Sequence, residues 1–185
     1  PFPQSDFIIC ESTYGNRLHP SRENVKAELL EIVHKICVEG RGKIMIPAFS
    51  VGRTQEIVYA LDQLEEEGKL PKIPIFVDSP LSVKATAVMR QHKECYNGNI
   101  MRYLKTGDGD AFGFDHLYYI SEKAESMELN QYKGPAIIIS ASGMAEAGRI
   151  KHHIANHIGE ENSAILFVGY CSPEGLGLSL IHISE

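Results

Sequence analysis

The chain has 185 residues, of which 43% are hydrophobic and 23% charged, the composition of a globular domain with a sizeable core. Its formal net charge of −6 excludes a generally basic surface for nucleic acid, so any polyanion contact must come from a local positive cluster. No apolar run approaches the roughly 18 residues of a membrane span. We therefore expect no membrane partner. The four scattered cysteines form no C-x-x-C pair, which favours a cytoplasmic protein with reduced thiols.

Short apolar runs alternate with amphipathic segments along the chain. The apolar runs are continuous, which is typical of parallel strands that are covered on both faces. They predict strands at Asp6–Cys10, Lys43–Pro47, Ile73–Asp78, Leu117–Ile120, Ala136–Ser140 and Ala164–Val168. The segments between them predict helices at Arg22–Glu39, Arg53–Glu67, Leu81–Lys93, Glu122–Gln131 and Ala145–His157. This order predicts an α/β fold with a doubly wound, mostly parallel sheet.

Start and stop signals support the first two helices. Ser21 precedes the first helix as an N-cap and Gly40 follows it, while Gly68 ends the second. Residues 97–115 interrupt the rhythm, because their glycines, asparagines and aspartates predict an irregular excursion or a surface lid.

Serines stand where several predicted strands turn into helices. Ser50, Ser79 and Ser142 occupy three of these junctions, and Arg53 and Arg149 add positive charge near two of them. Ligands of open parallel sheets bind beyond the carboxyl ends of the strands, and the first N–H groups of a helix attract anions. The pattern therefore predicts an edge lined with phosphate-binding groups.

Each of these residues alone has a plainer interpretation. A serine before a helix is commonly its N-cap, and Asp78 has an equal claim to that role. Arg53 and Arg149, taken singly, are ordinary surface or packing residues, and Glu11 is an ordinary solvated carboxylate. The prediction rests on the joint pattern and not on any one member.

Three histidines lie close together in the last predicted helix. His153 and His157 have the H-x-x-x-H spacing of zinc helices, but Ile154 occupies the position of the catalytic glutamate and no third ligand is near in sequence. We therefore expect no metal here, and favour a polar helix face, including His152, that meets a partner domain or an RNA backbone.

Five blocks of the sequence, in order, resemble those of β-CASP nucleases of the metallo-β-lactamase fold. The blocks are IICESTYGNR (8–17), IPAFSVGRTQEIVYAL (46–61), IFVDSPLSVKAT (75–86), IISASGMAEAGRIKHHI (138–154) and LFVGYCSPEGLG (166–177). The likeness is to bacterial and archaeal RNA-processing members and to the endonuclease subunit of eukaryotic cleavage and polyadenylation machinery. It covers the chain from about Asp6 to Gly177.

The resemblance implies a division of the chain. Residues 1–13 would be the last strand of the metallo-β-lactamase half, residues 14–177 the Rossmann-like β-CASP cap, and residues 178–185, LSLIHISE, a non-native tail. Glu11 matches the first acidic motif of the family, so the resemblance implies a catalytic residue that points into the cleft beside a dinuclear zinc centre. The H-x-H-x-D-H zinc signature is absent from this chain. Two zinc ions are thus expected in the parent ribonuclease and none in this chain, which alone is not expected to cleave RNA.

The implied partners are single-stranded RNA and the metallo-β-lactamase half of the same protein. The residues predicted to contact RNA or its phosphates, from their places at strand ends and in the family blocks, are Ser12, Thr13, Ser50, Arg53, Ser79, Ser140, Ser142, Gly143, Arg149, His152 and His153. Two alternatives stay open: a non-catalytic adaptor that binds nucleic acid or protein, and the cap of a DNA-processing relative. Without its neighbours, the strand at Asp6–Cys10 is expected to be poorly anchored, to lie along the cap or to drive homodimerisation.

Overall fold

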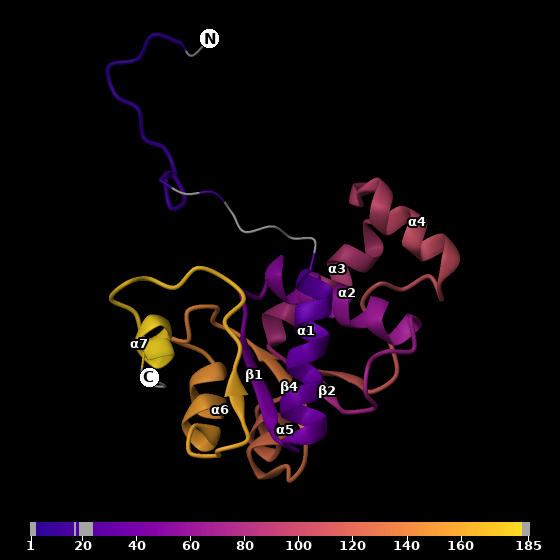
Figure 1. Ribbon diagram of the computed structural model, residues 1–185. Coiled ribbons are helices and arrows are strands. Elements are labelled where there is room, and N and C mark those ends of the chain that lie inside the picture. The colour runs from indigo at the N-terminus through magenta and orange to yellow at the C-terminus, as the bar shows by residue number, and fades with distance from the viewer. Residues whose placement is uncertain (1–2, 17, 19–23, 183–185) are drawn as a thin grey trace.

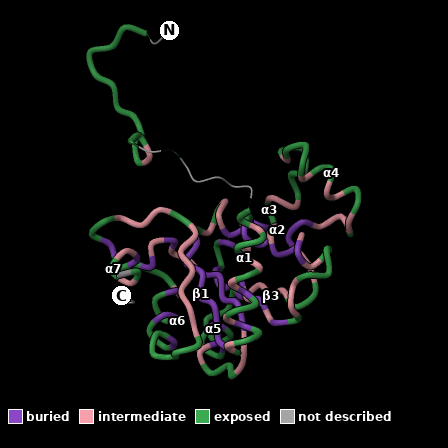
Figure 2. Tube along the Cα trace, viewed as in Figure 1, coloured by how far each residue is buried: buried purple, intermediate pink, exposed green. Residues whose placement is uncertain are grey.

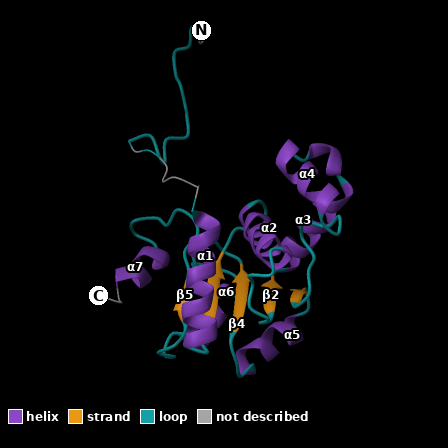
Figure 3. Cartoon of the chain, turned by 45° about the vertical axis from the view of Figure 1, so that its right-hand side comes forward, coloured by secondary structure: helices purple, strands orange, loops and turns teal. Residues whose placement is uncertain are grey.

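The computed structural model describes residues 3–16, 18 and 24–182, and its centre is a parallel β-sheet between two layers of helices (Figure 1). The strands are β1 (Lys43–Pro47), β2 (Ile75–Asp78), β3 (Leu117–Ile120), β4 (Ala136–Ser140) and β5 (Ala164–Ile165). Their order across the sheet is β3-β2-β4-β1-β5, and every neighbouring pair is parallel (Figure 3). The predicted doubly wound α/β sheet is confirmed.

Helices connect the strands in the predicted alternation. The α-helices are α1 (Val25–Val33), α2 (Arg53–Glu66), α3 (Pro80–Gln91), α4 (Gly98–Thr106), α5 (Lys123–Glu128), α6 (Ile150–His157) and α7 (Leu176–His182). Shorter turns of other helix types are η1 (His34–Glu39), η2 (Lys93–Cys95) and η3 (Leu129–Gln131). None of the helices in this described part of the chain is long and apolar enough to cross a membrane.

The alternation of side chains along β1 divides the core into two layers. Ile44 and Ile46 point into the larger cluster, which α1 and α2 cover with Val33 and Leu61 among others. Met45 points to the opposite face, where it packs with Ile150 and Ile154 of α6. Successive residues of a strand face opposite sides of the sheet, so burial on both faces explains why the strand sequences are continuously apolar.

The expected strand at Asp6–Cys10 is not a strand in this structure. Figure 2 shows residues 3–16 apart from the sheet, and all of them except the half-buried Tyr14 are exposed. Phe7, Ile8 and Ile9 are 92%, 73% and 100% exposed. A strand needs a neighbour for its backbone hydrogen bonds, and none of the five strands of this sheet pairs with this segment. The expectation of a poorly anchored segment fits this arrangement.

Three other expectations differ from the structure in detail. The segment 97–115 contains a regular helix, α4, and not only irregular chain. Helix α6 begins at Ile150 and not at Ala145, because Ala145 and Gly148 adopt left-handed backbone angles, with φ of 61° and 78°. The first helix changes to a π-helix after Val33. The predicted N-cap Ser21 lies outside the described residues.

Residues 176–182 continue the fold as α7. Leu180 packs against the smaller core cluster around Met45. Nothing in this packing bears on the origin of residues 178–185 or on the boundary near residue 13, so both stay predictions.

Candidate functional site

Three strand-to-helix junctions meet at the carboxyl edge of the sheet. The register places Pro47 of β1 beside Ser140 of β4, and Ser140 beside Asp78 of β2. Because these three strands are parallel neighbours, the segments that follow them leave the sheet from one edge. The common edge predicted from the sequence is therefore present.

The junction after β1 turns sharply into α2. Gly52 has a φ of 88°, in the left-handed region that glycine adopts without strain. Its N–H donates to Oε1 of Gln55 at 2.7 Å, and the Thr54 hydroxyl donates to the carbonyl of Phe49 at 2.8 Å. These bonds fix the turn, so Ser50 is held with its Oγ 3.1 Å from Oγ of Ser79 in the next junction.

The junction after β2 starts helix α3. Ser79 is its N-cap, since Oγ of Ser79 accepts a hydrogen bond from the Ser82 N–H at 3.2 Å, and Pro80 follows at the first helical position. The plainer interpretation of Ser79 is thus confirmed. At 5% exposure, this serine offers little surface to a ligand.

A buried carboxylate, Asp78, joins the second junction to the third. Its Oδ1 lies 2.7 Å from Nη1 of Arg149, and its Oδ2 lies 2.7 Å from Nε2 of His153. Ser126 donates to Oδ2 at 2.5 Å, and Ser140 donates to the backbone carbonyl of Asp78 at 2.7 Å. Asp78 and His153 are both 0% exposed, so water does not compete for the contact between them.

The surroundings of Asp78 stabilise its ionised form. Burial raises the pKa of this carboxyl, but hydrogen bonds from His153, Ser126 and Arg149 outweigh it and hold the pKa below its usual range. Nδ1 of His153 lies 3.1 Å from Oδ1 of Asn130, so both ring nitrogens face oxygen acceptors. The network ties α6, α5 and β2 together behind the edge.

The junction after β4 is a loop of tight turns. Oγ of Ser142 accepts a hydrogen bond from the Ala147 N–H at 3.3 Å, and the N–H of Ser142 donates to the Ala147 carbonyl at 3.0 Å. Gly143 leaves room for an aromatic ring: a Cβ at this position would lie 2.8 Å from Cδ2 of Phe49. The first and third junctions therefore touch through Phe49 and Gly143.

The predicted phosphate-binding residues fall into three groups by burial. Ser12, Thr13 and His152 are exposed, while Ser50, Arg53, Ser142 and Arg149 are half-buried. The members that the structure places in the interior are Ser79, Ser140, Gly143 and His153.

Burial corrects part of the prediction. Ser140 and His153 are buried and hold Asp78, so neither side chain is accessible to a phosphate in this structure. Arg149 is also engaged: besides Asp78, it donates from Nη2 to the Ser121 carbonyl at 2.7 Å. The polar helix face predicted for His153 and His157 faces the core, since His157 is 2% exposed.

The segment carrying Glu11 approaches the loop after β5. The Tyr14 ring lies 6.2 Å from the Tyr170 ring in an edge-to-face arrangement, and Tyr170 follows the fifth strand at the same edge. Oε1 of Glu11 accepts a hydrogen bond from the Thr13 N–H at 2.7 Å. The catalytic role of Glu11 stays a prediction.

The zinc ions implied by the resemblance do not fit these residues. Within the described ranges, no group of three or more histidine, cysteine, aspartate and glutamate side chains could hold a metal ion. No chemical step is therefore assigned to a metal bound by this chain.

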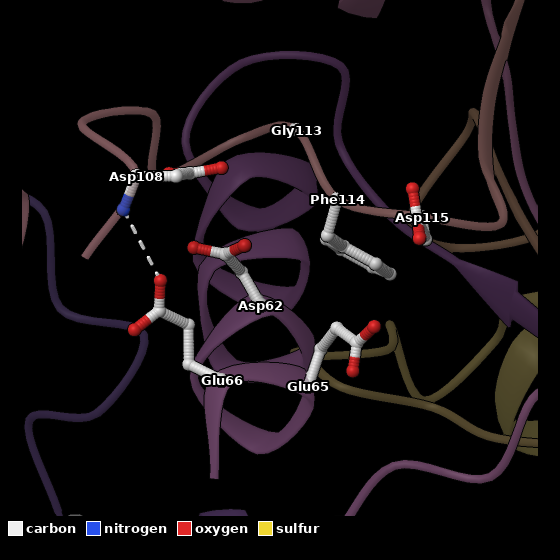
Figure 4. Close-up of a pocket in the computed structure, with 7 residues that line it drawn as sticks. All are labelled: Asp62, Glu65, Glu66, Asp108, Gly113, Phe114 and Asp115. Atoms are coloured by element: carbon white, nitrogen blue, oxygen red, sulfur yellow. Dashed lines mark hydrogen bonds between the residues drawn. The ribbon is translucent and has the colours of Figure 1, made fainter. Parts of the chain in front are cut away.

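An acidic pocket lies toward the opposite edge of the sheet. Carboxylates from the C-terminal half of α2 and from the loop before β3 surround this pocket (Figure 4). They belong to Asp62, Glu65, Glu66, Asp108 and Asp115. Burial, together with nearby Asp108, Glu66 and Asp110, raises the pKa of Asp62 to about 7 against the lowering effect of the Tyr103 hydroxyl. The carboxylates gathered here repel phosphates, so this pocket is unsuited to an anion.

Sequence reasoning missed two features of this edge. Asp78 was assigned at best a capping role, although its contacts with Arg149 and His153 bridge 71 and 75 positions of sequence. The second is Phe49, an aromatic residue two positions after the buried strand and at the start of a glycine-containing turn, a pattern that is visible in the sequence. Its 50% exposure needed the structure.

The sequence of this chain is similar to that of a known domain family and of several curated proteins. The family model for the Beta-Casp domain matches residues 54–180. Ribonuclease TTHA0252 of Thermus thermophilus is 34% identical over 97% of this chain and 41% of its own length. Endoribonuclease YSH1 of Kluyveromyces lactis is 30% identical over 95% of this chain and 23% of its own length.

A third relative comes from an animal. Cleavage and polyadenylation specificity factor 73 of Drosophila melanogaster is 28% identical over 92% of this chain and 24% of its own length. The chain thus spans less than half the length of each of these curated relatives.

Proposed function

Because this chain belongs to the Beta-Casp domain family, we propose that it is the RNA-binding cap of an RNA-processing nuclease. In this proposal the carboxyl edge of the sheet binds the phosphates of single-stranded RNA. The names of the relatives, which include a ribonuclease and an endoribonuclease, support a hydrolase that acts on RNA phosphodiesters.

One observation carries the proposal: three strand-to-helix junctions from β1, β2 and β4 contact one another at a single edge. Ser50 touches Ser79, and Phe49 touches Gly143. The Arg53 side chain is 40% exposed at the start of α2, where the helix dipole also favours an anion. Both arginines pair with a carboxylate, but Arg53 Nη1 meets Oε2 of Glu56 at 2.6 Å in an exposed pair, whereas Arg149 is held by the fully buried Asp78. An exposed pair is weak, so in our proposal Arg53 replaces Arg149 as the main phosphate contact.

Catalysis is assigned to another part of the parent protein. The described residues offer no metal-binding group, so in our proposal the two zinc ions belong to a metallo-β-lactamase half outside this chain, with Glu11 facing it. The exposed apolar residues Phe7, Ile8 and Ile9 then pair with the sheet of that half, which would bury them. The four cysteines are free thiols, which supports work in the reducing cytoplasm.

A nuclease assay tests this division of labour. The 185-residue chain is incubated with labelled single-stranded RNA and excess Zn²⁺ or Mn²⁺, with and without a chelator. We expect binding without cleavage. Metal-dependent turnover that the chelator abolishes would show that the chain carries its own metal site and would overturn the assignment.

A further inference from the structure

We propose that Phe49 is a stacking platform for one nucleobase of a single-stranded RNA whose phosphates bind the same edge. The inference rests on the proposed function and adds a contact to the base, since the serines and Arg53 explain only contacts to the backbone. It assigns to Phe49 a role that makes binding depend on the bases.

The exposure of Phe49 is the first observation. The five residues of β1 and the following Ala48 are buried, yet the next side chain, a large aromatic, is 50% exposed. The backbone beneath it is fixed, since the Phe49 carbonyl accepts from the hydroxyl of Thr54 at 2.8 Å and from its N–H at 3.3 Å. A fixed and half-exposed ring has little conformational freedom to lose when a base stacks on it.

The contact with Gly143 is the second observation. A Cβ at residue 143 would lie 2.8 Å from Cδ2 and 2.9 Å from Cε2 of Phe49, closer than carbon atoms approach in proteins. The ring therefore occupies the space that any larger residue at 143 would fill. Gly143 supports one side of the ring and leaves the remainder open to solvent.

Polar groups lie close to the ring in sequence, beside the 57% exposed Val51, and this mixture suits a nucleotide. Ser50 follows Phe49 directly, and the half-buried Ser142 precedes Gly143, so hydroxyl groups flank the ring on both junctions. Arg53, four residues on, adds a 40% exposed guanidinium, which also pairs with the exposed Glu56 at 2.6 Å. Aromatic faces beside a cationic, hydroxyl-lined path are the usual means of holding single-stranded nucleic acid without sequence preference.

The absence of tryptophan from the chain allows a direct test. Phe49→Trp introduces a single fluorophore at the proposed platform, and Tyr118→Trp introduces one at a 49% exposed aromatic position on the edge strand β3. Each variant is titrated with an oligouridylate and with an abasic oligomer of the same length. Phe49→Leu and Tyr118→Leu are compared in the same titrations by anisotropy of a labelled oligouridylate.

Stacking predicts that the oligouridylate quenches the tryptophan at position 49, that the abasic oligomer does not, and that neither quenches the tryptophan at 118. It also predicts that Phe49→Leu weakens oligouridylate binding about tenfold, within the range for one stacked base, while Tyr118→Leu leaves it unchanged. In a second outcome, the oligouridylate binds without quenching the tryptophan at position 49, and it binds Phe49→Leu as tightly as wild type. That result would refute stacking but would leave the proposed phosphate-binding edge intact. If wild type binds neither oligomer, the proposed function and the platform both fall.

Discussion

Replacing Asp62 with asparagine should stabilise the protein at neutral and alkaline pH. Asp62 is 2% exposed, and the carboxylates of Glu66 and Asp108 lie nearby in the acidic pocket (Figure 4). Burial and these carboxylates raise its pKa from 3.8 to about 7. Asparagine removes the charge but keeps a side-chain oxygen that can accept the hydrogen bond donated by Tyr103, which is 2.7 Å long in the wild type.

The size of the effect follows from linkage. A raised pKa in the folded state means that the contribution of Asp62 to stability is fully present below pH 3.8 and is lost as the pH rises through 7. The shift from 3.8 to about 7 corresponds to at most about 4 kcal/mol above pH 7 and to less than about 2 kcal/mol at pH 5. For a domain of this size, 4 kcal/mol raises Tm by roughly 10 °C.

Thermal unfolding followed by circular dichroism at pH 5 and pH 8 measures this difference. Asp62→Asn should raise Tm at pH 8 clearly more than at pH 5. Glu65→Gln removes a carboxylate from a more exposed position in the same pocket and should change Tm little at either pH. An equal effect of Asp62→Asn at both pH values, or a loss of stability at pH 8, would refute the argument from burial.

Two further changes test the packing behind the carboxyl edge. Asp78→Ala should lower the free energy of unfolding in urea at pH 7 by about 3–5 kcal/mol, because it leaves the cation of Arg149 without its carboxylate partner in a largely buried site. The pKa of Asp78 is depressed, so this loss should shrink as the pH falls below 3.8; a loss that does not depend on pH would contradict the ion pair. Gly143→Ala should cost roughly 1–3 kcal/mol by displacing the ring of Phe49. Combined with Phe49→Leu, it should cost clearly less than the sum of the two single changes, and strict additivity would refute the contact.

The sheet was predictable because its signal is local. Each strand in the middle of the sheet is buried on both faces, so its sequence is continuously apolar, as in Ala136–Ser140 and Lys43–Pro47. The same rule failed at Asp6–Cys10, since an apolar run becomes a strand only where a neighbouring strand is available. Helix α4 was obscured by the glycine and asparagines that begin it, although Ile100, Tyr103 and Leu104 have helical spacing.

The candidate site was predictable in position but not in its contacts. Parallel strands place their following residues at one edge, so Ser50, Ser79 and Ser142 could be grouped from sequence alone. Which polar groups face solvent depends on partners far away in the chain. Arg149 was expected at the surface, but Asp78, 71 positions earlier, draws it inward. The sequence around a charged residue therefore does not show whether its side chain is exposed, because its partner can lie far away in the chain.

The salt dependence of RNA binding tests the central claim, that the carboxyl edge of the sheet binds phosphates, most directly. Arg53 and Arg41 flank the strand β1 at its carboxyl and amino ends, so Arg53→Gln and Arg41→Gln remove the same charge from opposite edges. Affinity for an oligouridylate is measured for both variants and wild type across a range of salt concentrations. Arg53→Gln should weaken binding and reduce the slope of log K against log salt by about 0.7, the value for one phosphate contact on a single strand, whereas Arg41→Gln should match wild type. Equal effects of the two variants, or none from Arg53→Gln, would contradict the account.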